Sequence, residues 1–219
     1  MMSLIYGLLS AALFGISAWL WRRRGGLNDN ARGAITAALL ALLLPAASSL
    51  LLTLDSFALS ETLTHIQRML GLAAQNISLP LLGLTAFYMA FGLRWQPANW
   101  GRILLGLMAA FELTRRMDMQ HNYQWSINLL SLALLLLAGA LILRRDLRPM
   151  LFGSLAAIGI GAPLFSPGAA ALAGLLSSSP LALWLFPTLL GAGLAVGLLS
   201  EQAHNSHNES VEAPNAERT

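Results

Sequence analysis

The sequence contains neither cysteine nor lysine, and each absence excludes a class of protein. Without cysteine the chain forms no disulfide, iron–sulfur cluster or thiolate zinc site, and it has no cysteine nucleophile. Without lysine it has no side-chain amine for a Schiff base, which excludes a retinal protein. All 13 basic residues are therefore arginine, whose permanently charged guanidinium binds phosphate or carboxylate through two hydrogen bonds.

Charged residues are scarce as well. They make up 11% of the chain and hydrophobic residues 56%, whereas about 25% of the residues in an average soluble domain are charged. The apolar residues come in runs close to the roughly 20 residues that cross a bilayer as a helix. The composition therefore predicts an all-α, polytopic integral membrane protein. Its net charge of +3 is sorted along the chain rather than gathered into a basic patch, so a nucleic-acid partner is not expected.

Seven apolar stretches are predicted to cross the membrane: 4–21, 34–52, 69–93, 103–113, 125–143, 150–165 and 181–199. The fourth is short and contains Glu112, so its helix must extend into polar residues at both ends. Residues 168–178 are too few to cross alone, and we expect an interfacial helix or a re-entrant segment there. Residues 1–200 then form one helical bundle, and 201–219 form a polar, disordered cytoplasmic tail.

The arginines predict the orientation of the bundle. No basic residue precedes the first stretch, and Arg22, Arg23 and Arg24 follow it directly. A cleaved signal peptide has the opposite order, so we expect an uncleaved first helix with the N-terminus outside. Seven crossings then put ten arginines on the cytoplasmic side and three outside, an asymmetry typical of a bacterial inner-membrane protein. The three outer arginines are Arg68, Arg115 and Arg116.

A polar stripe runs along the start of the third helix. At 100° per residue, Glu61, His65, Arg68, Gln75 and Asn76 fall on one face. Polar groups deep in a membrane are costly unless they face other helices or a wet cavity. The stripe therefore indicates a polar site. The alternative is that the two amides bond neighbouring helices while the three charged or ionisable residues lie among lipid headgroups.

A second polar cluster is predicted around the loop between the fourth and fifth stretches. Glu112 and Arg116 are four residues apart and can pair along one helical face. Short connections make successive helices neighbours, so this cluster is expected to face the polar stripe and to form an outward-opening pocket. Its members are Glu112, Arg115, Arg116, Asp118, His121, Asn122 and, one turn further into the fifth helix, Asn128.

Three kinds of site could be built from these residues. Guanidinium groups with nearby hydrogen-bond partners could hold a small anion or a polar metabolite. A b-type haem needs two histidines on facing helices, and His65 with His121 is the pair that the sequence offers. A metal site, including that of a membrane-embedded metal-dependent enzyme, could combine these histidines with Glu61, Glu112 or Asp118.

No motif specifies a substrate or a reaction. The residues favour a non-enzymatic multi-pass protein that binds a small polar or anionic ligand, or a membrane partner, at its outer face. It would act as a transporter component, a receptor or an assembly factor. Because its cytoplasmic loops and tail are short, a receptor of this kind would signal through another membrane protein. The competing hypotheses are a redox subunit that carries haem b and the metal-dependent enzyme.

Overall fold

The computed structural model describes residues 2–27, 29–54, 61–93, 95–142, 146–161, 171–177 and 179–202. Every regular element in these ranges is helical, so the predicted all-α class is confirmed. The elements are α1 (Met2–Arg23), η1 (Arg24–Gly26), α2 (Asp29–Leu54), α3 (Glu61–Phe91), α4 (Pro97–Arg116), α5 (Gln120–Ile142), α6 (Arg148–Gly161), η4 (Ala171–Leu175), α7 (Ala182–Leu185) and the π turn η5 (Phe186–Leu190). The last two open one continuous C-terminal helix, Ala182–Gln202.

Five helices in the described part are long and apolar enough to cross a membrane: α1, α2, α3, α5 and the C-terminal helix. The predicted count of seven is not confirmed. Helix α4 has 20 residues but is too polar to qualify, and α6 is described over 14 residues. Residues 162–165 of the predicted sixth stretch and the predicted tail beyond residue 202 lie outside the described residues.

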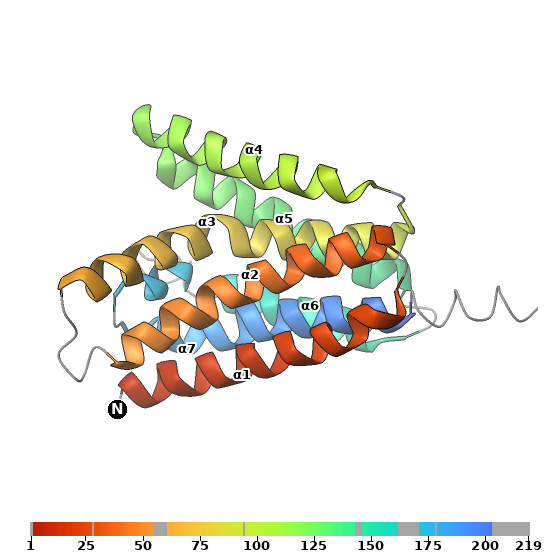
Figure 1. Cartoon of the computed structure of the whole chain (residues 1–219), viewed down its shortest axis with the longest axis horizontal. Coiled ribbons are helices and arrows are strands. Elements are labelled where there is room, and N and C mark those ends of the chain that lie inside the picture. The colour runs from red at the N-terminus through yellow and green to blue at the C-terminus, as the bar shows by residue number, and fades with distance from the viewer. Residues whose placement is uncertain are drawn as a thin grey trace, which may run out of the picture.

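Successive helices run back and forth, so their connections gather at two ends of the bundle (Figure 1). At one end Arg23 of α1 forms an ion pair with Glu201 of the C-terminal helix. At the same end Gln202 donates a hydrogen bond to the Asp146 carboxylate, 3.2 Å away, just before α6. The end of α1, the start of α6 and the end of the chain's last helix therefore lie together.

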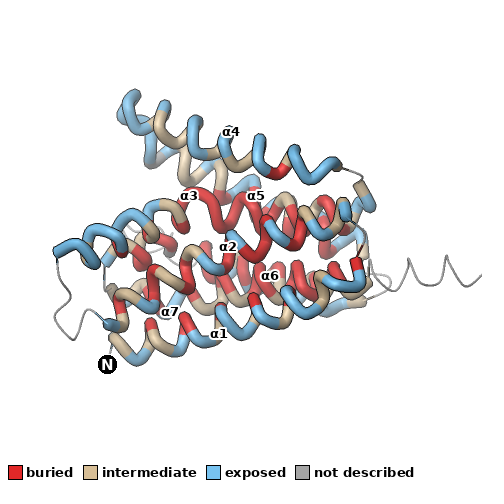
Figure 2. The backbone as a smooth tube through the Cα atoms, in the orientation of Figure 1, coloured by how far each residue is buried: buried red, intermediate tan, exposed pale blue. Residues whose placement is uncertain are grey.

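Helix α3 forms the centre of the bundle, and Figure 2 shows its middle as a continuous buried stretch. It has 31 residues, which corresponds to about 46 Å at 1.5 Å per residue. This exceeds a hydrocarbon core of about 30 Å, so its exposed first turns extend beyond the apolar part. The helix ends where Gly92 takes φ 59° and the Leu93 amide bonds the Tyr88 carbonyl at 3.2 Å. A left-handed glycine after the last helical residue is a common helix stop.

Helix α4 lies on the outside of the bundle (Figures 1 and 2). Pro97 opens it in the first helical position, where the missing amide costs nothing. Trp100 is its one fully buried residue. The Trp100 ring lies 5.5 Å from Tyr88 and 5.7 Å from Trp95, centroid to centroid. This aromatic cluster attaches the start of α4 to the end of α3.

Residues 171–177, here called the 3-10 segment, are buried among the helices. Leu172 and Leu175 are 1% and 0% exposed. Polar side chains from three helices bind the segment's carbonyls. Tyr6 of α1 donates to Gly174 O at 2.6 Å, while Ser48 of α2 and Gln67 of α3 donate to Leu175 O at 3.0 and 2.8 Å. Buried backbone carbonyls are tolerated when protein groups satisfy them in this way.

Glycines allow the close contacts of this packing. A Cβ on Gly191 in the C-terminal helix would lie 2.7 Å from the Phe152 carbonyl of α6. A Cβ on Gly83 of α3 would lie 2.5 Å from the Ser131 carbonyl of α5. Small residues let helices approach to backbone contact in a membrane, where dispersion forces and hydrogen bonds hold them together.

Candidate functional site

Four amide side chains, which we call the carboxamide cluster, line the contact between α3 and α5. Gln75 donates a hydrogen bond to Gln124 at 3.2 Å, and Gln124 donates to Asn76 at 3.4 Å. Asn76 donates in turn to the Leu72 carbonyl of its own helix at 2.7 Å. The fourth member is Asn128, one helical turn after Gln124.

The two helices of the cluster are parallel, because their contacts advance along both in the same direction. Gln75 meets Gln124 near one end, and Gly83 meets the Ser131 backbone two turns further along. The sequence offset between partners is 49 at the first contact and 48 at the second. Asn128 therefore lies between these two contacts, on the face of α5 that Gln124 and Ser131 share.

Two acceptor atoms of the cluster have no hydrogen bond within the described residues: Gln75 Oε1 and Asn128 Oδ1. Both atoms are buried, and their side chains are 5% and 4% exposed. A buried polar atom that lacks a partner costs roughly 1–3 kcal/mol. Such a cost persists where the atom serves a ligand or an ordered water, so these two oxygens mark the place where a donor fits.

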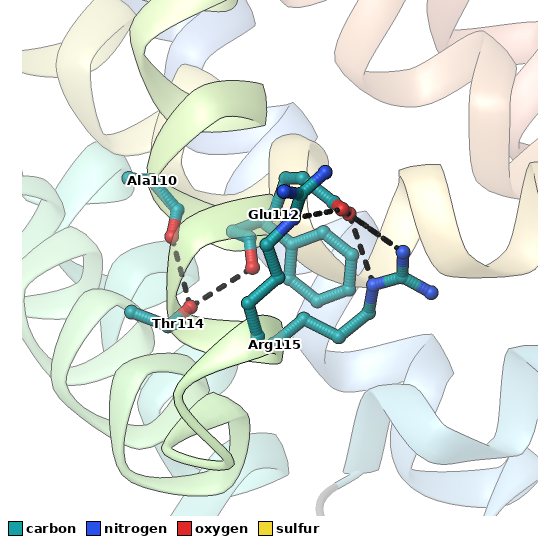
Figure 3. A network of polar contacts seen from close by, with 6 residues as sticks. Ala110, Glu112, Thr114 and Arg115 are labelled. Atoms are coloured by element: carbon teal, nitrogen blue, oxygen red, sulfur yellow. Dashed lines mark hydrogen bonds and ion pairs between the residues drawn. The ribbon is translucent and has the colours of Figure 1, made fainter.

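Three members of the predicted second cluster, Glu112, Arg115 and Arg116, form a local network on the surface of α4. Figure 3 shows Glu112 and Arg115 facing one another at the end of this helix. Arg115 donates to both Glu112 oxygens, at 2.9 and 3.0 Å, and Arg116 donates to Oε1 at 3.0 Å. The predicted pairing of Glu112 with Arg116 is thus present.

Asp118 occupies the turn that ends α4. Its φ is 60°, and the amide of the next residue, Met119, donates to the Thr114 carbonyl at 2.9 Å. Aspartate is one of the few residues besides glycine that adopt this left-handed conformation. Its backbone thus closes the helix while its side chain points to the exterior.

The first turns of α3 are on the surface, where Glu61, His65 and Arg68 are all exposed. Within the described residues, no hydrogen bond or ion pair connects them to Glu112 or its two arginines. The deep end of the stripe, Gln75 and Asn76, instead bonds Gln124 of α5. The outward-facing pocket rimmed by three arginines thus stays a prediction, while the deep end of the stripe has a defined partner.

The haem and metal hypotheses also stay predictions. His65 is exposed, and the His121 side chain lies outside the described residues. Among the described side chains, no group of three or more histidine, aspartate or glutamate residues is placed to hold a metal ion.

Gln124 is the site residue that sequence reasoning missed. It precedes Trp125, where the predicted fifth stretch begins, and an amide at a helix start usually faces water. The available signal was its spacing, because Gln124 and Asn128 are four residues apart and share a helical face. Comparison of the chain with protein-family models, with curated proteins and with solved structures finds no match, so its function is argued from these residues alone.

Proposed function

We propose that this chain is a multi-pass protein of the bacterial inner membrane that binds a small polar solute between α3 and α5. It acts as a transporter component, or as a receptor that signals through another membrane protein. The observation that carries the proposal is the pair of buried acceptors, Gln75 Oε1 and Asn128 Oδ1, that lack a donor in the described part. A solute that brings N–H or O–H groups supplies the missing donors.

The chemistry of the cluster favours an uncharged solute. Its four side chains are amides, which offer donors and acceptors but no counter-charge for an ion. Arg115 and Arg116, which would have attracted an anion, already share the Glu112 carboxylate. Amides are also poor nucleophiles and bases, so binding is better supported than catalysis.

The proposed topology keeps seven crossings, with the N-terminus outside and the C-terminus in the cytoplasm. Contacts at the arginine-rich end support it, because Arg23 at the end of α1 pairs with Glu201 at the end of the C-terminal helix. An odd number of crossings between α1 and the C-terminal helix accounts for these two helices running in the same direction. Arginine-rich loops stay in the cytoplasm, so this end faces inward. The carboxamide cluster then opens toward the outer side.

Substitution of Asn128 by leucine tests the site. If Asn128 Oδ1 lacks a donor in the empty protein, Asn128→Leu removes an unsatisfied group and raises the free energy of unfolding by about 1 kcal/mol. The same variant removes the acceptor, so permeation of glycerol or urea into proteoliposomes falls to the rate of protein-free vesicles. Stability is measured by detergent-induced unfolding and permeation by stopped-flow light scattering.

Asn122→Leu is the matched control, because Asn122 is exposed on the same helix. Asn122→Leu should leave both the rate of solute permeation and the free energy of unfolding near the wild-type values. The proposal is wrong if Asn128→Leu lowers stability in the absence of solute, because Asn128 would then have a structural partner. Glycerol could instead raise the free energy of unfolding in a saturable way that depends on Asn128, without permeating the vesicles. That result would select the receptor over the transporter.

The orientation has its own test, which the absence of native cysteine makes clean. Gly25→Cys lies at the arginine-rich end, and a Cβ there meets nothing within 4 Å. Glu61→Cys and Met119→Cys lie at exposed positions of the opposite end. A membrane-impermeant maleimide added to intact spheroplasts should label the last two and spare the first. The reverse pattern inverts the topology.

A further inference from the structure

A groove of about 760 Å³ separates α2 from α4 at the arginine-rich end of the bundle. Helix α4 contacts α2 near Trp100. A Cβ added to Gly33 of α2 would lie 3.2 Å from the Trp100 ring. Beyond that contact the two helices leave a space whose floor is Leu81 of α3. The groove is separate from the carboxamide cluster, because the cluster lies on the side of α3 that faces α5.

The groove is charged at one end and apolar along its length. Arg24, Asp29 and Arg32 line the charged end, while Leu40, Leu81 and Leu104 line the apolar part. From Gly33 to Leu40 the wall on α2 extends about 10 Å at 1.5 Å per residue. An occupant that fits has a polar anionic head and an apolar chain.

The charge at the mouth selects a single negative charge. Two arginines and one aspartate give a net charge of +1. Arg32 is held toward the mouth by a 3.2 Å hydrogen bond to Asp29 and another of 3.2 Å to the Gly25 carbonyl. The Arg24 guanidinium lies 5.0 Å from the centre of the Trp21 ring. A phosphodiester carries one negative charge and accepts hydrogen bonds from guanidinium groups.

A buried donor beside the groove points to the same kind of ligand. The indole N–H of Trp100 has no acceptor within the described residues, although Trp100 is only 6% exposed and lines the groove. Indole nitrogens at the ends of membrane helices commonly bond the ester and phosphate oxygens of lipids. We propose that the groove between α2 and α4 is a binding site for one anionic phospholipid of the leaflet at the arginine-rich end. Its phosphate lies between Arg24 and Arg32, and one acyl chain lies along Leu40 and Leu104.

Two glycines on α4 provide a matched test. Gly101 lines the groove and Gly106 does not, and a Cβ at either position meets nothing within 4 Å. Gly101→Leu therefore fills the groove without a clash, whereas Gly106→Leu adds the same side chain elsewhere on the same helix. Dioleoyl phosphatidylglycerol, dioleoyl phosphatidylcholine and inorganic phosphate are titrated into the purified full-length protein in detergent, and bound lipid is counted by native mass spectrometry.

The expected result is one tightly bound phosphatidylglycerol that phosphatidylcholine and inorganic phosphate do not displace. Gly101→Leu should weaken its binding about tenfold, because the acyl chain loses the groove, while Gly106→Leu should not. Replacing both Arg24 and Arg32 by glutamine should remove the preference for the anionic lipid. Equal binding by the two glycine variants, equal binding of the two lipids, or displacement by inorganic phosphate alone would each overturn the proposal.

Discussion

The carbonyl of Leu175 provides the sharpest test of how this bundle is held together. Ser48 and Gln67 donate hydrogen bonds to it at 3.0 and 2.8 Å, and Gln67 also reaches the Ser48 hydroxyl at 3.4 Å. Gly71 of α3 lies against the same carbonyl so closely that no Cβ would fit. The two side chains are therefore alternative donors to one buried acceptor.

The magnitudes follow from this shared acceptor. Ser48→Ala or Gln67→Leu alone leaves Leu175 O with the other donor, so each should cost about 0.6–1 kcal/mol, the usual net value of such a bond between membrane helices. The double variant leaves the carbonyl without either donor and adds a desolvation penalty of roughly 1–3 kcal/mol. The cost of the double variant should therefore exceed the sum of the single costs by about 1 kcal/mol or more.

The assay is reversible unfolding in mixed micelles with increasing sodium dodecyl sulfate, followed by tryptophan fluorescence and circular dichroism. Ser49→Ala is the control, because this neighbouring hydroxyl bonds the Pro45 and Ala46 carbonyls of its own helix. Its effect should add to that of Gln67→Leu. Additivity within about 0.5 kcal/mol for the Ser48–Gln67 pair would refute the shared-acceptor argument.

Three further predictions concern separate contacts. Tyr6→Phe should cost about 1–3 kcal/mol of unfolding free energy, because its hydroxyl bonds the 3-10 segment, whereas Tyr123→Phe, which loses one 3.4 Å bond, should be nearly neutral. Gly83→Ala should destabilise by about 1–3 kcal/mol through overpacking against α5, whereas Gly106→Ala on the open face of α4 should stabilise slightly in the same unfolding assay. Glu112→Gln should break the ion pairs with Arg115 and Arg116, so the protection of backbone amides at the end of α4 should fall relative to the wild type when hydrogen exchange of both proteins is measured at the same neutral pH.

The strongly apolar helices could be predicted from the sequence because one property decides them. The stretch 34–52 becomes α2, Asp29–Leu54, and the stretch 125–143 becomes α5, Gln120–Ile142. The differences lie at the ends, where polar residues extend a helix beyond its apolar part. The fourth stretch shows the limit of this reasoning. A helix forms there, but hydropathy does not decide whether an amphipathic helix with one buried residue crosses the bilayer.

The candidate site was predictable only in part. Charged residues at helical spacing indicate a site in the sequence, whereas a single amide does not. Glu112, Arg115 and Arg116 form a conspicuous pattern, yet their pairing satisfies them at the surface. Gln124 looked like an ordinary helix start, although it joins two residues of the predicted stripe. The donors to the 3-10 segment were hidden for the same reason, since Gln67 is a lone amide beside the stripe. Which helices become neighbours decides these roles, and spacing within one helix does not reveal it.

The outside position of α4 has a consequence for how the protein is made. Helix α4 lies outside the α3–α5 contact (Figure 1), and it is the one described helix of 18 or more residues that is too polar to qualify as a membrane span. A helix of low apolarity is a poor substrate for insertion by itself. If α4 crosses the bilayer as the proposed topology requires, we expect it to insert together with the strongly apolar α5, which packs against α3. We therefore expect assembly of this bundle to depend on α5 in two ways. Helix α5 provides one side of the amide contact with α3, and it promotes the insertion of α4.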